Sequence, residues 1–140
     1  MDIMWNQILH KAVDTSYFCK DIIPAGTVVF EDEPDSMGNL IATKRNTGKL
    51  LGICMNDVVE FTKFSYPSPL EVYSGGKINI CCTGIINIRL PKRLGILQVG
   101  QPIYVGKIGN PTLKITNSLL GYICKSRDSH GYHCLELRRY

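Results

Sequence analysis

The chain has 140 residues, of which 44% are hydrophobic and 20% are charged. This composition suits one globular domain and excludes a chain that is disordered throughout. No stretch approaches the roughly 18 apolar residues of a membrane span, and residues 1–6 do not start a secretory signal. We therefore expect a soluble protein that is made in a cytosol.

The net charge of +4 is distributed unevenly along the chain. Residues 1–84 carry 7 Lys and Arg against 10 Asp and Glu, a net charge of −3. Residues 85–140 carry 9 Lys and Arg against 2 Asp and Glu, a net charge of +7. This split predicts a surface with an acidic side and a basic side, which suits docking onto a charged partner or binding to a nucleic acid. Charge that is merely scattered over a solvated surface is the alternative.

The first twenty residues differ from the rest of the chain. Trp5, Ile8 and Leu9 have rough helical spacing, but no convincing N-cap precedes them. Trp5 is the only tryptophan and lies near a terminus. We expect residues 1–21 to form an extended or short-helical N-terminal arm, which packs on its own body or on a partner, or is disordered.

Residues 22–140 consist of short β-branched and aromatic runs separated by turn residues. The runs expected to form strands are residues 27–30, 40–43, 50–55, 70–73, 77–90, 101–105, 112–115, 119–125 and 132–138. Gly75 and Gly76 predict a hairpin between the strands on either side of them, and Gly84 predicts a bulge or a sharp bend. Residues 61–69 are expected to form an irregular packed loop. Strands about every 8–12 residues, without helical periodicity, predict a single all-β domain at 22–140, either a compact β-sandwich or a β-barrel-like fold.

An internal similarity relates the two halves of the sequence. In the same order, residues 26–30 match 100–104, residues 50–54 match 119–124, and residues 74–80 match 129–135. The matches indicate either a duplicated β unit or the same strand and turn signals used twice.

The cysteines carry no recognisable metal or disulfide pattern. They are Cys19, Cys54, Cys81, Cys82, Cys124 and Cys134. Without a secretion signal, most of them are expected to be small core residues, with Cys81 and Cys82 pointing to opposite faces of their strand. Cys124, His130, His133 and Cys134 are zinc ligands by type, but their spacing matches no familiar site, and the last two are adjacent on a strand. We therefore expect no bound metal.

Catalytic motifs are absent from the sequence, which has no glycine loop for phosphate, no G-x-S-x-G elbow and no H-E-x-x-H helix. We therefore expect neither an enzyme nor a cofactor, although a cysteine and a histidine that meet in space would escape this search. Basic residues alternate with Tyr104, Tyr122, Tyr132 and Tyr140 toward the end of the chain. A β-barrel that binds single-stranded nucleic acid is therefore an alternative.

Several strand starts and turns between residues 22 and 138 form a recognisable series. They are Ala25-Gly26-Thr27-Val28-Val29, Leu50-Leu51-Gly52-Ile53 followed by Asn56-Asp57, Gly76-Lys77-Ile78-Asn79-Ile80, Val99-Gly100-Gln101-Pro102-Ile103-Tyr104-Val105, and Leu120-Gly121-Tyr122-Ile123 with Asp128-Ser129-His130-Gly131-Tyr132. In this series the chain resembles the small capsid decoration, or cement, proteins of tailed bacteriophages. The six cysteines and residues 61–73 have no counterpart in the family's pattern.

The resemblance implies a β-rich body on the outer surface of an icosahedral head, reached after synthesis in the host cytoplasm. Proteins of this family commonly sit at junctions between major capsid subunits, where they stabilise the shell and contact neighbouring copies. We expect a homotrimer, with a dimer as the alternative. The family has no catalytic residues, cofactor or metal to carry over, and neither a membrane nor a nucleic acid is an expected partner.

We expect the contacts with the major capsid protein or with neighbouring copies to lie on the arm and on one basic loop. Aromatic anchors dominate interfaces, and the basic half could face acidic capsid surface or the acidic residues 31–35 of a neighbouring copy. The predicted contact residues are Ile3, Met4, Trp5, Ile8, Leu9, Lys92 and Arg93. The alternative functions are a single-stranded nucleic-acid-binding β-barrel protein and another virion structural protein, of the tail or of head completion.

Overall fold

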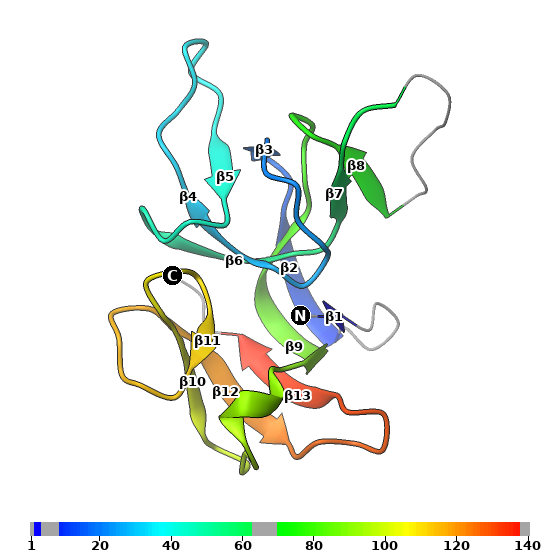
Figure 1. Ribbon diagram of the computed structural model, residues 1–140, viewed down its shortest axis with the longest axis vertical. Helices are drawn as coiled ribbons and strands as arrows, with labels where there is room; N and C mark the ends of the chain where they lie inside the picture. The colour runs from blue at the N-terminus through cyan, green and yellow to red at the C-terminus, as the bar shows by residue number, and fades with distance from the viewer. Residues whose placement is uncertain (1, 4–8, 63–69, 138–140) are drawn as a thin grey trace.

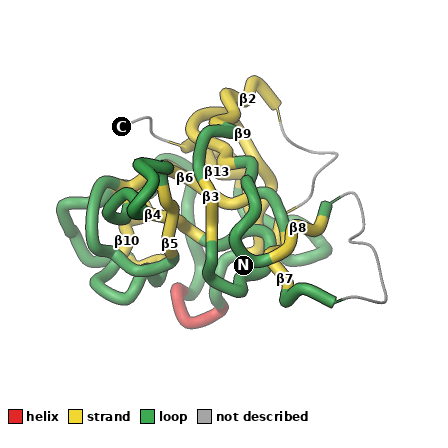
Figure 2. The backbone as a smooth tube through the Cα atoms, turned by 90° about the horizontal axis from the view of Figure 1, so that it is seen from above, coloured by secondary structure: helices red, strands yellow, loops and turns green. Residues whose placement is uncertain are grey.

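Strands make up nearly all of the regular structure, as the sequence predicts. The computed structural model describes residues 2–3, 9–62 and 70–137, and for residues up to 12 it describes the backbone alone (Figure 1). The strands are β1 (Asp2–Ile3), β2 (Leu9–Asp14), β3 (Phe18–Cys19), β4 (Val28–Glu31), β5 (Ile41–Thr43), β6 (Leu50–Cys54), β7 (Asp57–Val59), β8 (Glu71–Tyr73), β9 (Ile80–Arg89), β10 (Pro102–Val105), β11 (Pro111–Thr112), β12 (Leu119–Lys125) and β13 (His133–Leu137). Within the described ranges the one helical segment is the 3-10 helix η2 (Lys92–Leu94), drawn in red in Figure 2.

One large sheet contains most of the strands, in the order β11-β10-β12-β13-β9-β6-β4-β5-β3. β1 and β2 also pair with β9, while β7 and β8 form a separate parallel pair. The large sheet curves so that loops near its two ends meet, and there the Asn46 side-chain amide donates a 3.1 Å hydrogen bond to the Gly106 carbonyl. The body is therefore barrel-like.

The large sheet contains two groups of four strands that pair in the same order, and the groups meet where β9 pairs with β13. β4, β5, β6 and the start of β9 form a first unit, and β10, β11, β12 and β13 form a second unit with the same pairing. In the first unit Val29 lies opposite Gly52, and in the second unit Ile103 lies opposite Gly121. Each of these pairs is followed by a register shift. The matching sequence segments therefore occupy equivalent positions of a β unit that is repeated in three dimensions.

Two hydrophobic cores lie on opposite faces of the first unit. The larger core, which also takes in the second unit, consists of Val28, Phe30, Leu50, Ile53, Met55, Cys81, Ile86, Ile88, Leu90, Leu94, Leu97, Ile103, Val105, Leu120, Ile123, Leu135 and Leu137. The smaller core consists of Tyr17, Cys19, Ile23, Val29, Ala42, Cys54, Val58, Ile78 and Ile80. Cys81 belongs to the larger core and Cys82 packs against the smaller one, so their predicted opposite orientation is confirmed.

β9 connects the two units. Ile80 and Cys81 pair with β6, whereas residues 84–88 pair with β13. Cys81, Ile86 and Ile88 all belong to the larger core, so the buried positions change from odd to even along the strand. Gly84, with a φ of 129°, lies at the change. The bend predicted at Gly84 is therefore present, and it reverses which face of the strand points into the larger core.

The hairpin predicted around Gly75 and Gly76 is wrong. β8, which precedes these glycines, pairs in parallel with β7 and not with the strand that follows. The reason is that residues 75–78 bond with residues 17–19, through hydrogen bonds such as Cys19 N to Gly76 O at 3.0 Å. The tight turn itself remains, since the Gly76 N–H donates to the Tyr73 carbonyl at 2.9 Å.

One expected strand is shorter in the structure, and one expected loop lies largely beyond the part of the chain that the structure describes. The strand expected at 112–115 ends at Thr112, because the Thr112 hydroxyl accepts a hydrogen bond from the Lys114 N–H and turns the chain. The irregular loop expected at 61–69 lies mostly outside the described residues.

Part of the expected N-terminal arm belongs to the sheet. The backbone of residues 9–14 is extended and pairs with β9, and β1 pairs with the end of the same strand. Tyr17 and Cys19 are buried in the smaller core. Of the two forms expected for the arm, the extended one is therefore present at residues 9–14, packed on its own body. A boundary between residues 21 and 22 stays a prediction.

Candidate functional site

The charges that are separated in the sequence are also separated in space. The first unit, with β7 and β8, lies at one end of the long axis of the molecule, and the second unit lies at the other (Figure 1). Among the residues whose side chains the structure describes, 13–62 and 70–84 carry 5 Lys and Arg against 9 Asp and Glu, and 85–137 carry 7 Lys and Arg against 2 Asp and Glu. The acidic and basic sides predicted from the sequence are these two ends.

A cleft in the second unit gathers part of the positive charge. It has a volume of about 660 Å³ and lies between the segment that leads into η2 and the loop between β12 and β13. Its lining residues are Arg89, Leu90, Pro91, Lys92, Arg127, Ser129, His130 and Gly131. We call this cleft, together with the cavity beside it described below, the basic cleft.

The β12–β13 loop is held in a tight turn by its own carboxylate. Asp128 Oδ1 accepts hydrogen bonds from the backbone N–H groups of His130 at 2.8 Å and Tyr132 at 2.9 Å. The Gly131 N–H donates to the Asp128 carbonyl, and Gly131 has a φ of 88°, which favours glycine. The N–H donors, that of Tyr132 first, lower the pKa of Asp128, so the carboxylate is charged and faces its own backbone.

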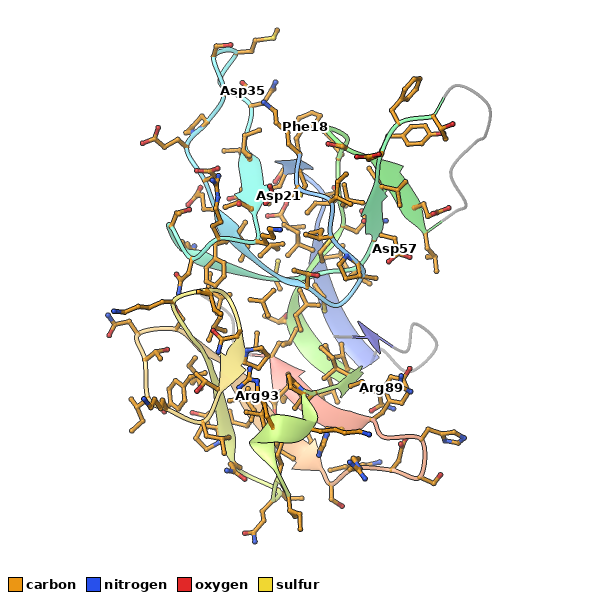
Figure 3. All side chains as sticks on the ribbon, viewed as in Figure 1. Phe18, Asp21, Asp35, Asp57, Arg89 and Arg93 are labelled. Atoms are coloured by element: carbon orange, nitrogen blue, oxygen red, sulfur yellow. The ribbon has the colours of Figure 1, made fainter. Side chains whose placement is uncertain are left out.

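Arg89 fastens this loop to the end of β9. Its guanidinium lies 4.6 Å from the centre of the Tyr132 ring, and its Nη2 donates a 3.2 Å hydrogen bond to the His130 carbonyl. Figure 3 labels Arg89 at this end of the molecule, and Arg93 on η2. The walls of the basic cleft are therefore braced by side-chain contacts.

A second cavity of about 430 Å³ adjoins the first and shares Lys92 and Arg127 with it. It is also lined by Gly95, Ile96, Leu97, Ser126 and His133. His133 is only 5% exposed, and its Nδ1 has no hydrogen-bond partner among the residues that the structure describes. Burial first, and then the Arg127 charge, lower the pKa of His133. The imidazole is therefore neutral at neutral pH, and its buried Nδ1 is left without a hydrogen bond to a described residue.

The predicted contact residues are distributed unequally with respect to this site. Lys92 is exposed on the shared wall of both cavities. Arg93 is also exposed, but its Nη2 donates a 2.7 Å hydrogen bond to the Pro111 carbonyl and ties η2 to β11. Ile3 and Leu9 lie on β1 and β2, where only the backbone is described. Met4, Trp5 and Ile8 lie outside the described residues.

The sequence interpretation did not place Arg89, Arg127, His130 or His133 in a common contact site. The sequence marks Arg127 only as one of many basic residues, and it marks the two histidines only as possible zinc ligands. The available signal was the segment from Arg127 to Gly131, in which Arg127 directly precedes a turn with Asp128 at its start and Gly131 at its end. Its distance in sequence from Lys92 concealed that the two segments form one cleft.

The geometry around the cysteines favours packing over reactivity. Cys19, Cys54, Cys81 and Cys134 are buried and are not in disulfide bonds, and burial raises the pKa of the Cys54 thiol to about 12. Burial likewise raises the pKa of Cys124 to about 11, beside Cys134. Thiols with such pKa values are protonated at neutral pH and are poor nucleophiles. Within residues 13–62 and 70–137, no three His, Cys, Asp or Glu side chains lie close enough to hold a metal ion.

In the described part of the chain, no helix is both long and apolar enough to cross a lipid bilayer.

Comparisons with known proteins give little beyond this geometry. No protein-family model matches the sequence, and no curated protein sequence matches it. The structure is similar to the crystal structure of the head fiber gp8.5 N base in bacteriophage phi29, with 14% sequence identity and a TM-score of 0.48. The similarity covers 92% of this chain and 95% of that chain. At this level of similarity, no property of the one protein carries over to the other.

Proposed function

We propose that this chain is a capsid decoration, or cement, protein that binds the outer surface of a tailed-phage head at junctions between major capsid subunits and stabilises the shell. The observation that carries the proposal is the segregation of charge between the two ends of one compact β body. A decoration protein needs such a body with charged docking surfaces, and its contacts can be individually weak because many copies bind to one lattice.

The resemblance to the cement proteins supports the same function. Its motifs begin β4, β6, β10 and β12 and include the paired glycines Gly52 and Gly121, so they are the residues that build the two units. The proposed contacts with the shell are those of the N-terminal segment, with Trp5 as the aromatic anchor. We assign Lys92 and the other exposed residues of the basic cleft to contacts between copies of this chain.

The copy number in purified virus particles tests the proposal. We expect a ratio to the major capsid protein of the same order as one, measured by quantitative mass spectrometry of purified particles. A few copies per particle would indicate a tail or head-completion protein instead. Complete absence from particles would overturn a structural role and would bring binding of single-stranded nucleic acid forward as the function to test.

The role of the N-terminal segment is tested with a matched pair of variants. Trp5→Ala should reduce occupancy on heads by about tenfold or more, because aromatic anchors carry most of an interface's binding energy. Phe61→Ala removes an aromatic side chain that is 67% exposed, and it should leave occupancy unchanged. Urea unfolding of both isolated variants controls for stability. Unchanged occupancy of Trp5→Ala would remove the segment from the contact surface.

A further inference from the structure

The internal repeat identifies one segment that the β unit does not need. In the second unit β10 and β11 are joined by residues 106–110, and the Gly106 N–H closes the turn onto the Asn110 carbonyl at 2.8 Å, with only residues 107–109 between them. The equivalent bond in the first unit runs from Asp32 N to Ile41 O at 2.9 Å, but residues 33–40 lie between. The longer connection extends from the acidic end of the molecule (Figure 1). We call residues 32–40 the acidic hairpin.

The acidic hairpin is held in shape by hydrogen bonds within it, and several of its side chains are exposed. Asp35 Oδ1 accepts hydrogen bonds from the N–H groups of Met37 and Asn39, both at 2.9 Å, and the Gly38 N–H donates to the Asp35 carbonyl. Asp32 pairs with Arg45 at 3.3 Å. Glu33 is exposed, and Met37, at 84% exposure, projects from the tip. A segment that is ordered before it binds loses less entropy when it binds.

The basic cleft has the complementary features at the opposite end. Lys92 and Arg127 are exposed on the wall that its two cavities share, and neither makes an ion pair with any residue that the structure describes. Beside these groups Ile96 is 95% exposed. The cleft therefore suits an occupant that combines carboxylates with an apolar side chain.

We propose that the basic cleft binds the acidic hairpin of a second copy of this chain, so that copies associate head to tail. Glu33 would approach Lys92 and Arg127, and Met37 would pack near Ile96. The hairpin cannot reach the cleft of its own chain, because the two lie at opposite ends of the body (Figure 3). A head-to-tail contact uses two different surfaces, so it closes into a ring or continues along a surface.

This inference does not rest on the proposed function, because it concerns the isolated protein. The test is sedimentation velocity of the purified chain over a range of protein and salt concentrations. We expect association at low ionic strength that weakens as salt is added, because exposed charges are screened within about 10 Å at 0.1 M salt. A wild-type chain that stays monomeric at every concentration and ionic strength would overturn the proposal.

Charge reversal identifies the surfaces. Arg127→Glu and Glu33→Lys should each abolish self-association, while Lys114→Glu, a reversal on the same unit outside the cleft, should not. The decisive step is mixing Arg127→Glu with Glu33→Lys. Each variant retains the surface that matches the other, so the mixture should associate although neither variant does alone. Association by either single variant at the wild-type strength, or a mixture that remains monomeric, would contradict the pairing.

A second variant covers the case in which a charge reversal fails to fold, as judged by circular dichroism. Residues 33–40 are replaced by the shorter connection Lys107-Ile108-Gly109, which removes Glu33 and Met37 but retains the turn of the repeated unit. This variant should be monomeric, and it should still bind the hairpin of the wild-type chain through its own intact cleft. Self-association of the shortened variant at the wild-type strength would remove the acidic hairpin from the interface.

Discussion

At Gly52 and Gly121 the repeat leaves no space for a side chain. A Cβ at Gly52 would lie 2.1 Å from the Cys81 carbonyl oxygen, and a Cβ at Gly121 would lie 2.1 Å from the Glu136 carbonyl oxygen. Both oxygens belong to the backbone of the neighbouring strand, which cannot move without disturbing its pairing. The Leu-Leu-Gly motif of the sequence is thus explained by the close approach of two strands.

We predict that Gly52→Ala and Gly121→Ala each lower the free energy of unfolding by about 2–4 kcal/mol, through overpacking of backbone against backbone. Gly38→Ala is the control, because it has a φ of 80° but nothing within 4 Å of its Cβ position. Its cost should be about 1–2 kcal/mol, that of the left-handed conformation alone. Urea unfolding measures all three. Equal costs at Gly121 and Gly38 would contradict the explanation.

His133 makes stability depend on pH. Its pKa is lowered in the folded protein by burial and by Arg127, against a smaller opposite effect of Asp128, and Lys92 lies on the same cavity. The unfolded chain therefore binds a proton on His133 at a higher pH than the folded chain does. Stability should fall as the pH drops below about 6.5, the ordinary pKa of histidine, until the folded pKa is reached.

The measurement is the urea midpoint between pH 7.5 and pH 5.5, above the range in which the carboxylates titrate. His133→Gln should flatten the pH dependence over this interval. His130→Gln, a change at the exposed histidine of the same loop, should leave it as in the wild type. A wild-type midpoint that does not change over this interval would contradict the effect of burial on His133.

Among the elements, the acidic hairpin is the one that the fold should tolerate losing. Shortening it to the connection of the second unit keeps the bond from Asp32 N to Ile41 O, and a backbone carbonyl still precedes Ile41 to accept from the Phe18 N–H. We predict that the shortened chain unfolds within about 1 kcal/mol of the wild type, since shortening a loop changes its closure entropy little. A loss of several kcal/mol in urea unfolding would show that the hairpin supports the fold.

The elements also show which inferences from sequence succeed. Runs such as 50–55 and 119–125 were predicted correctly, because β-branched content and bordering turns are local signals. The hairpin at Gly75 was predicted wrongly, because residues 75–78 form backbone hydrogen bonds with residues 17–19, which are distant in the sequence. Turn residues indicate where a chain bends, but they do not determine which strand it then joins.

For the molecule as a whole, the sequence predicts the separation of charge and not the cleft. The separation is visible because it follows chain order, and each unit is one continuous stretch. The basic cleft is hidden because Lys92 lies on η2 while Arg127 and His133 lie after β12. Their proximity depends on the pairing of β9 with β13, which no local pattern contains.

β9 has a consequence for how the chain folds during synthesis. Its edge from Gly84 to Ile88 is paired by residues 133–137, which leave the ribosome only after everything between them has been made. At 5–20 residues per second, this edge stays open for about 3–10 s on each nascent chain. Open strand edges are sites of aggregation. The nascent chain is therefore most prone to aggregate before β13 is translated, and factors that shield nascent chains should raise its yield.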